Sequence, residues 1–139
     1  MTRYWIGVVC EEHAKNGRKE GIAQFCHGKL WPVKKISKGD WIIYYSPRIK
    51  MNESKPCKSF TTIGQVVDAD PYQVEQFPGF KPYRRKVEYQ DAKTVPIDLL
   101  KDKLEFIKES PNWGMLMRRG FFEINGNDFK LISRAMRES

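Results

Sequence analysis

The segment Gly39–Tyr45 constrains the fold more than any other part of the sequence, because it predicts a β-strand with apolar side chains on both faces. Alternate side chains of a strand point to opposite faces. One face carries Trp41, Ile43 and Tyr45, and the other carries Ile42 and Tyr44. Such a strand has to be covered on both sides, as in a closed or nearly closed barrel that carries helices. The expected fold class is therefore α+β, a mixed β-barrel surrounded by short helices.

Length and composition indicate one folded domain. The 139 residues suffice for one core but not for two, so a single domain over residues 1–139 is expected. A content of 13% aromatic and 40% hydrophobic residues excludes a disordered chain. The sequence shows no secretion signal and no apolar run of roughly 20 residues, which predicts a cytoplasmic protein. Three widely spaced cysteines without a Cys-x-x-Cys pair argue against disulfides and against a zinc site.

The remaining elements follow from periodicity and from breaking residues. Alternating or wholly apolar runs predict strands over residues 4–9, 58–67, 83–89 and 119–124. Helical spacing predicts one or two turns over residues 11–16 that end at Gly17, a helix over 97–108, and a terminal helix capped by Asn125 or Asn127. Residues 16–21 are expected to form a polar loop, and the Pro- and Gly-rich residues 68–82 an irregular excursion of a kind often tied to function.

Charge and aromatic content together favour nucleic acid as the partner. The chain has 25 Lys and Arg against 17 Asp and Glu, a net charge of +8, and most of the excess lies in residues 1–60. Aromatic rings stack on bases while basic side chains hold phosphates, and this combination suits a protein that binds single strands or flipped bases.

Catalytic and metal-binding interpretations have little support in the sequence. Cys26 and His27 are adjacent, so in extended chain their side chains point to opposite faces and cannot readily form a thiol–imidazole pair. A pair between Cys26 and His13 would depend on tertiary packing alone. The two histidines show no metal-ligand spacing, so no metal, cofactor or catalytic residue is expected.

Two side chains have both a structural and a functional interpretation. Arg85 falls on the apolar face of its strand, so it either pairs with a buried carboxylate such as Asp40 or points into a polar pocket. Trp113 follows a break in the helical pattern, so a loop is expected to place its ring either in the core or in a pocket. Trp41, in the middle of the doubly apolar strand, is expected in the core.

Seven short motifs, which occur in order along nearly the whole chain, resemble those of the EVE domain family. They are Tyr4–Val9, Cys26–Lys29, Gly39–Pro47, Phe60–Gly64, Arg84–Arg85, Phe106–Ile107 and Asn112–Gly114. The resemblance implies a PUA-like fold, a mixed-sheet pseudobarrel related to the YTH domains that hold methylated adenine in an aromatic cage. It implies no catalytic activity, and it suggests a reader of a modified base in DNA or RNA.

The resemblance also implies the residues of a site, between the first strand, the Cys26–Lys29 loop, the end of the Gly39–Pro47 strand and the Asn112–Gly114 loop. The ligand-binding residues nominated by motif are Trp5, Cys26, His27, Gly28, Tyr45, Ser46, Pro47, Arg85, Asn112 and Trp113. The residues expected to hold flanking phosphates are Lys29, Lys34, Lys35, Arg84 and Lys86.

The chain departs from the family pattern at two places. Residues 115–117 are Met, Leu and Met where relatives often carry an aromatic residue, and Cys10 stands where they often have Ser. Two alternatives to a nucleic-acid reader remain open. One is a hydrolase of a nucleotide-like molecule that uses Cys26 or His27, and the other is a protein-interaction module.

Overall fold

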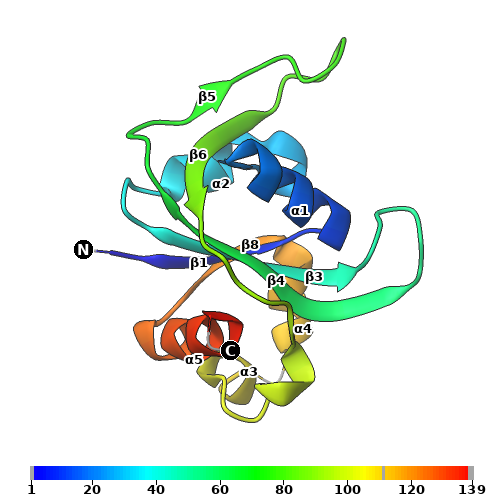
Figure 1. Cartoon of the computed structure of the whole chain (residues 1–139), viewed down its shortest axis with the longest axis vertical. Coiled ribbons are helices and arrows are strands. Elements are labelled where there is room, and N and C mark those ends of the chain that lie inside the picture. The colour runs from blue at the N-terminus through cyan, green and yellow to red at the C-terminus, as the bar shows by residue number, and fades with distance from the viewer. Residues whose placement is uncertain (1, 111, 138–139) are drawn as a thin grey trace.

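A computed structural model describes residues 2–110 and 112–137 and shows one curled mixed sheet with helices on both faces (Figure 1). The strands are β1 (Tyr4–Val8), β2 (Ile22–Ala23), β3 (Trp41–Arg48), β4 (Pro56–Val66), β5 (Tyr72–Gln73), β6 (Tyr83–Tyr89), β7 (Val95–Pro96) and β8 (Phe121–Ile124). Their order is β2-β6-β4-β3-β1-β8, with β5 paired to β6 and β7 to β4. Strand β1 runs parallel to β3 and antiparallel to β8, so the first strand of the chain lies inside the sheet.

Five helices cover the two faces of this sheet. Helices α1 (Glu11–Glu20) and α2 (Leu30–Lys35) lie on one face, and α3 (Glu105–Lys108), α4 (Trp113–Arg119) and α5 (Gly126–Arg137) lie on the other (Figure 1). No helix in the described part of the chain is both long and apolar enough to cross a membrane.

Strand β3 packs against both helical layers, as its pattern predicts. Ile43 and Tyr45 belong to the cluster under α3, α4 and α5, whereas Ile42 and Tyr44 belong to the cluster under α1 and α2. Trp41 packs against the first of these clusters but is only partly buried, so its expected core position is met in part. The α+β class and the mixed, helix-covered sheet are confirmed as well.

The first helix is longer than predicted. It continues through Gly17 and ends at Gly21, whose φ of 72° places it in the left-handed region that glycine adopts most readily. Gly17 marks close packing rather than a helix end, because a Cβ at this position would lie 3.0 Å from the carbonyl oxygen of Ile22. The predicted polar loop over residues 16–21 is therefore wrong.

The predicted helix over residues 97–108 is also wrong, because the segment forms two short pieces. A single 3₁₀ turn spans Ile97–Leu99, and α3 starts only at Glu105. The carboxylate of Asp128, on α5, accepts hydrogen bonds from the backbone N–H of Glu105 and of Phe106, at 2.8 and 3.0 Å. A side chain distant in sequence thus starts the new helix by satisfying its free donors.

Other boundaries shift by a few residues. Strand β3 continues through Pro47 to Arg48, where it pairs with Pro56 across a register irregularity. Strand β6 has the predicted bounds, and Asn125 caps α5 through a 2.8 Å hydrogen bond from the backbone N–H of Asp128. Trp113 begins helix α4 and is not held by a loop.

Candidate functional site

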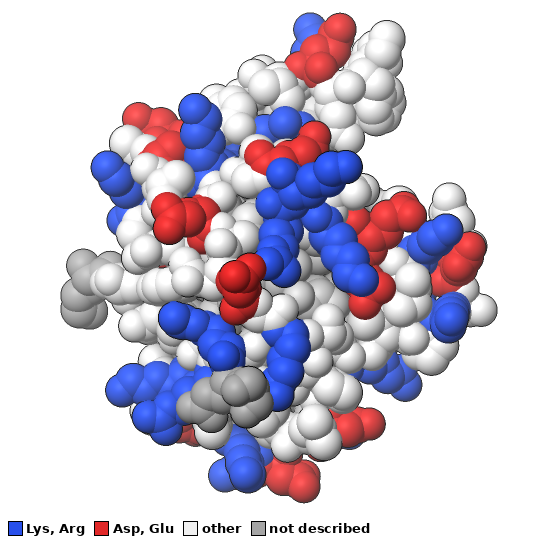
Figure 2. Space-filling model, in the orientation of Figure 1, with Lys and Arg blue, Asp and Glu red and all other residues white. Residues whose placement is uncertain are grey.

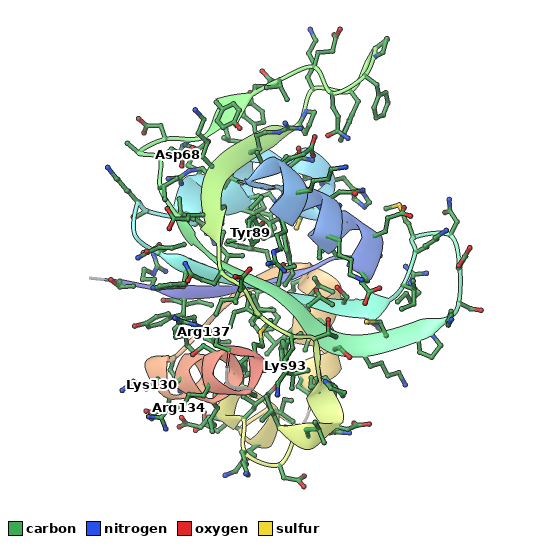
Figure 3. The ribbon with its side chains drawn as sticks, in the orientation of Figure 1. Asp68, Tyr89, Lys93, Lys130, Arg134 and Arg137 are labelled. Carbon is green, nitrogen blue, oxygen red and sulfur yellow. The ribbon has the colours of Figure 1, made fainter. Side chains whose placement is uncertain are left out.

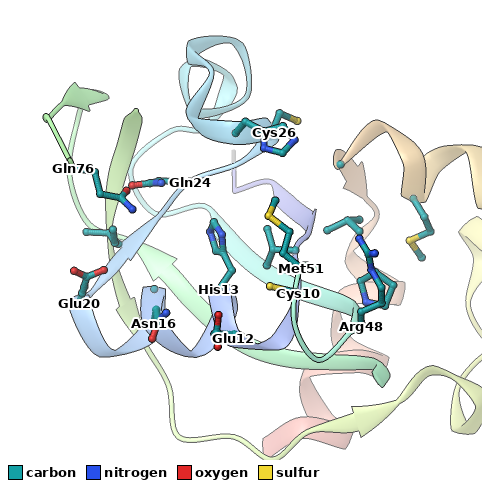
Figure 4. A pocket seen from close by; sticks show the side chains of 18 of the residues that line it. Cys10, Glu12, His13, Asn16, Glu20, Gln24, Cys26, Arg48, Met51 and Gln76 are labelled. Atoms are coloured by element: carbon teal, nitrogen blue, oxygen red, sulfur yellow. The ribbon is translucent and has the colours of Figure 1, made fainter. Parts of the chain in front are cut away.

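The main candidate site is a cavity of about 870 Å³ at one end of the sheet, shown in Figure 4. Strands β1 and β3 are parallel, so their C-terminal ends, near Val8 and Pro47, meet at the same edge. Backbone hydrogen bonds from Val8 to Gly120 and from Val9 to Tyr45 join this edge to the end of α4 and to β3. Helix α1 and the turn after β2 complete the walls. The lining residues used below are Cys10, His13, Gln24, Cys26, His27, Pro47, Arg48, Gln76 and Arg119.

The turn Cys26–Gly28 has an unusual backbone. All three residues have positive φ, at 51°, 61° and 81°, although two of them carry a side chain. Each non-glycine residue in this region costs energy that the surrounding structure must offset. A Cβ at Gly28 would lie 2.3 Å from Cβ of Pro82, so this position admits only glycine. The thiol of Cys26 donates a 3.4 Å hydrogen bond to the carbonyl oxygen of Arg119, which fixes the turn to the end of α4.

Gln24 presents a buried amide at one wall of the cavity. Its backbone is fixed by Tyr44, whose hydroxyl accepts from the Gln24 N–H at 3.1 Å and donates to the Gln24 carbonyl at 2.9 Å. The side chain is 7% exposed, and among the described residues its Oε1 has no hydrogen-bond partner. Figure 4 shows it on the same wall as Gln76. A buried polar atom without a partner is costly, so a ligand donor that reached this oxygen through a small movement of the side chain would recover that cost.

His13 lies on the wall formed by α1. Burial lowers the pKa of its imidazole, with a smaller lowering contribution from His27, while a backbone hydrogen bond with Gln24 opposes the shift. The ring is therefore neutral at pH 7, with one nitrogen that donates and one that accepts. His13 and Cys26 line the same cavity, a proximity that depends on tertiary packing and that the sequence alone does not predict.

The thiol of Cys26 is not activated. Burial raises its pKa, and the nearby Lys29 opposes this shift only in part. The thiol therefore stays protonated at pH 7, whereas a nucleophilic cysteine needs a lowered pKa. In residues 2–110 and 112–137, no group of three or more His, Cys, Asp or Glu side chains is arranged to hold a metal ion.

The charged residues that line the cavity are mostly basic. Lys19 comes from α1, Arg48 from the end of β3, and Arg118 and Arg119 from the last turn of α4. Glu12 and Glu20 are the acidic side chains among the described lining residues. This excess of basic side chains favours an anionic ligand.

Of the ten ligand-binding residues that the sequence nominates, the structure brings Cys26, His27 and Pro47 together in the cavity. Gly28, the last residue of the same turn, packs against Pro82 and is not among the described lining residues. Tyr45 and Ser46 are buried in the sheet, and the Ser46 hydroxyl is 2.8 Å from that of Thr61.

The nominated tryptophans lie away from the described lining of the cavity. Trp5 is 3% exposed, stacks on Phe121 at 4.8 Å, and donates from Nε1 to Asp40 at 3.1 Å. Trp113 packs against the hydrophobic cluster on the other face of the sheet, with Asn112 exposed beside it.

Arg85 forms the buried ion pair that the sequence allowed, but with a different carboxylate. Its Nε donates to Asp68 Oδ1 at 2.7 Å, and its guanidinium also donates to the carbonyl oxygens of Val33, Ile36 and Asp68. The expected pairing with Asp40 is wrong, because Asp40 instead accepts hydrogen bonds from Trp5 and from the backbone N–H of Arg3 and Ser37. Arg85 therefore ties β6 to α2.

The residues nominated to hold phosphates lie around α2 and β6. Lys34 and Lys35 end α2, and the ammonium of Lys35 lies 5.3 Å from the ring of Trp31. Lys86 lies on β6, and Lys29 is exposed after the turn. Arg84 donates to Gln76 Oε1 at 3.1 Å and so supports the cavity wall.

Sequence reasoning missed the polar side chains that line the cavity. His13 and Gln24 stand in segments whose predicted boundaries were wrong or unassigned, and Arg48 and Arg119 were not nominated for the site. The one available signal was the position of Arg48 directly after the motif Gly39–Pro47, whose end the family resemblance had already placed at the site.

The curled mixed sheet with short helices on both faces defines a PUA-like domain. Similar folds include the ASCH protein from Zymomonas mobilis, with a TM-score of 0.61, 14% identity and 96% of both chains covered. They also include the YTH domain of Zygosaccharomyces rouxii MRB1 in complex with N6-methyladenosine RNA, with a TM-score of 0.59, 18% identity and 96% and 85% of the two chains covered.

The model of the EVE domain matches residues 3–135, and the chain belongs to the EVE domain family. Among its relatives, the UPF0310 protein YdcG of Bacillus subtilis is 45% identical over 97% of this chain and 92% of the relative. The UPF0310 protein msl3206 of Mesorhizobium japonicum is 43% identical over 98% and 93%. The family and PUA-like fold implied by the sequence motifs are thus confirmed.

Proposed function

We propose that this chain is a non-enzymatic nucleic-acid-binding domain that takes one unpaired or flipped base, carrying a modification, into the cavity. The observation that carries the proposal is the buried carboxamide of Gln24, whose Oε1 has no partner among the described residues inside a cavity of about 870 Å³. A carboxamide offers a donor and an acceptor side by side, which matches the adjacent donor and acceptor on the edge of a base.

The size and walls of the cavity suit such a ligand. Its volume falls in the range of small-molecule sites, about 300 to 1,000 Å³, and leaves room for a base with an added group. The imidazoles of His13 and His27 offer flat faces of a kind that RNA-binding proteins use for stacking. They would take the place of the aromatic cage that the resemblance implied.

The cations suit the phosphates of the same strand. Lys19, Arg48, Arg118 and Arg119 line the cavity, and the second group, Lys29, Lys34, Lys35, Arg84 and Lys86, lies on or beside α2 and β6. Phosphate contacts of this kind position a strand, while the base edge gives specificity. The YTH domain with its N6-methyladenosine RNA is a precedent for a modified nucleotide on a related fold.

The other nominated residues divide by position. Trp5, Gly28, Tyr45, Ser46 and Arg85 would act from behind the cavity wall by holding the strands in place. Direct contact of Asn112 and Trp113 with the base stays a prediction, and Trp113→Ala tests it. If this variant binds modified oligonucleotides as tightly as the wild type does, Trp113 does not form part of the site.

The central experiment measures fluorescence anisotropy with labelled DNA and RNA strands of about 12 nucleotides, each carrying one modified base. Gln24→Leu keeps the size of the side chain but removes both polar atoms, and should weaken the best-binding probe about tenfold or more. Gln90→Leu is the matched control, because the Gln90 side chain does not line the described cavity. Affinity should fall steeply between about 50 and 200 mM salt. Equal binding by wild type and Gln24→Leu would overturn the proposed site.

A further inference from the structure

A projecting hairpin, residues 74–82, stands beside the cavity, and we call it the finger. It extends the pairing of β5 with β6 away from the body of the domain (Figure 1). The backbone N–H of Gln76 donates to the carbonyl of Phe80 at 2.9 Å, and that of Phe80 donates to Phe77 at 2.9 Å. Pro78 and Gly79 occupy the centre of the turn, and the φ of 87° at Gly79 is the value a type II turn requires. The finger is therefore a defined structure.

The base of the finger is joined to the cavity at two points. Gln76 lines the cavity, and its Oε1 accepts the 3.1 Å hydrogen bond from Arg84. The ring of Phe80 lies against Gly28, because a Cβ on that glycine would be 3.5 Å from Phe80 Cζ. The strained turn that carries Cys26 and His27 thus contacts the finger directly.

The tip of the finger exposes an aromatic ring. Phe77 is 56% exposed, although the tilted ring of Phe80, 5.0 Å away between centroids, holds it in place. An exposed Phe on a well-defined turn costs hydrophobic free energy that a partner would recover. A flat partner the size of a nucleobase would cover this ring, whereas a stable protein contact needs about 800 Å² on each side.

We infer that Phe77 stacks on a nucleobase adjacent to the base that enters the cavity. The inference rests on the proposed function and extends it to a second nucleotide of the same strand. Removing one base from a stack leaves its neighbour with an uncovered face, and apolar side chains commonly occupy such positions. Lys29 and Lys81 are exposed near the base of the finger and supply positive charge for the intervening phosphate.

The test uses the fluorescein-labelled strand that binds the wild type best, together with two derivatives that are abasic at the position on either side of the modified base. Phe77→Ala should weaken the intact strand about tenfold, and Phe77→Leu nearly as much, because Leu is apolar but has no flat face. Phe77→Trp should bind at least as tightly as the wild type. Leu99→Ala removes another exposed apolar side chain, 69% exposed and not in the finger, and should have no effect.

The abasic strands identify the contact itself. For the wild type, one of the two abasic strands should bind about tenfold more weakly than the intact strand. For Phe77→Ala, that abasic strand and the intact strand should bind equally well, because this variant lacks the ring that stacks on the missing base. Binding that depends on Gln24 but not on Phe77 would overturn the inferred stacking role of Phe77 and leave the proposed function intact. A change from dimer to monomer in Phe77→Ala, without a change in affinity, would also overturn it. If the wild type binds none of the strands, both the proposed function and the stacking role of Phe77 that rests on it are wrong.

Discussion

The two faces of the sheet are built differently. Under α3, α4 and α5 the core is apolar, with Ile6, Ile43, Phe60, Leu104, Ile132 and Met136 buried together. Under α1 and α2 the apolar core is interrupted by the buried polar groups of Gln24, Asp40 and Arg85, and this face borders the cavity. The face under α3, α4 and α5 stabilises the fold through apolar packing. On the face under α1 and α2, buried polar groups replace part of that apolar packing and hold the walls of the cavity in place.

Surface charge does not separate the two faces. Lys93, Lys130, Arg134 and Arg137 lie on or beside α5, on the side opposite α1 and α2 (Figure 3). Figure 2 shows that basic side chains gather over this part of the molecule too. The difference between the faces therefore lies in what is buried beneath them, and substitutions of buried residues test it.

The largest effect is expected at Arg85, the buried cation under α2. Arg85→Met should lower the free energy of unfolding by about 3 kcal/mol, because Asp68 and three carbonyl oxygens lose their donor. The cost falls at the low end for such pairs since the Asp68 side chain is 16% exposed and gains water. Urea unfolding measures it, with Ile132→Val on the other face costing about 1 kcal/mol. Equal losses would show that the buried polar groups do not distinguish the two faces.

Glycine positions give a second, smaller contrast. A Cβ at Gly7 would lie 2.3 Å from Phe25 Cε1 and 2.8 Å from Tyr44 Cε1, under α1 and α2. Gly7→Ala should therefore cost about 1–3 kcal/mol by overpacking. Gly114, in α4, has no atom within 4 Å of the same position, and Gly114→Ala should be neutral or stabilise by up to about 1 kcal/mol. Thermal unfolding of the two variants checks the signs, and a tolerated Gly7→Ala would mean that the packing around β1 is loose.

Asp128 is a buried carboxylate on the face covered by α3, α4 and α5. Asp128→Ala removes the acceptor for the backbone N–H groups that begin α3 and should cost about 1 kcal/mol in urea unfolding. Binding of oligonucleotides should be unchanged, because Asp128 is on the face opposite the cavity. Asp98→Ala, at an exposed position, is the control and should leave both measurements unchanged. If Asp128→Ala binds oligonucleotides more weakly than the wild type, the packing of the face under α3, α4 and α5 affects the cavity on the other face.

The smallest effect is a dependence on pH that belongs to His13. Burial lowers the pKa of His13 in the folded protein below its ordinary value of 6.5. Between these two pKa values the unfolded chain binds more protons, so stability rises with pH and is lost as the solution is acidified through this range. Between about pH 7.5 and 5.5, the wild type should therefore lose more of its unfolding free energy than His13→Gln does. Identical losses would place His13 in water rather than in the cavity wall.

The sequence predicted the strands better than the helices and the site. The apolar pattern of Gly39–Tyr45 and the alternation of Tyr83–Tyr89 are local, and both strands appear as predicted. The break before Glu105 depends on Asp128, which is 23 residues away, and no local pattern contains it. Motifs located the turn at Cys26 and His27, but the polar walls at His13 and Gln24 arise from packing between distant segments. Aromatic residues nominated as walls of the site, such as Trp5, are instead buried in the hydrophobic core, where they pack against other rings.

The order of the strands has a consequence for synthesis. Of the strands in this sheet β1 is synthesised first, yet it takes its place only between β3 and β8, and β8 is the last of these strands to be made. The cavity likewise draws its walls from segments between Val8 and Gly120. A nascent chain therefore displays the finger well before it has a pocket for a base. Because contacts this distant in sequence form late and slowly, the ability to hold a ligand is gained only after β8 has been made, and products that stop before β8 should lack it.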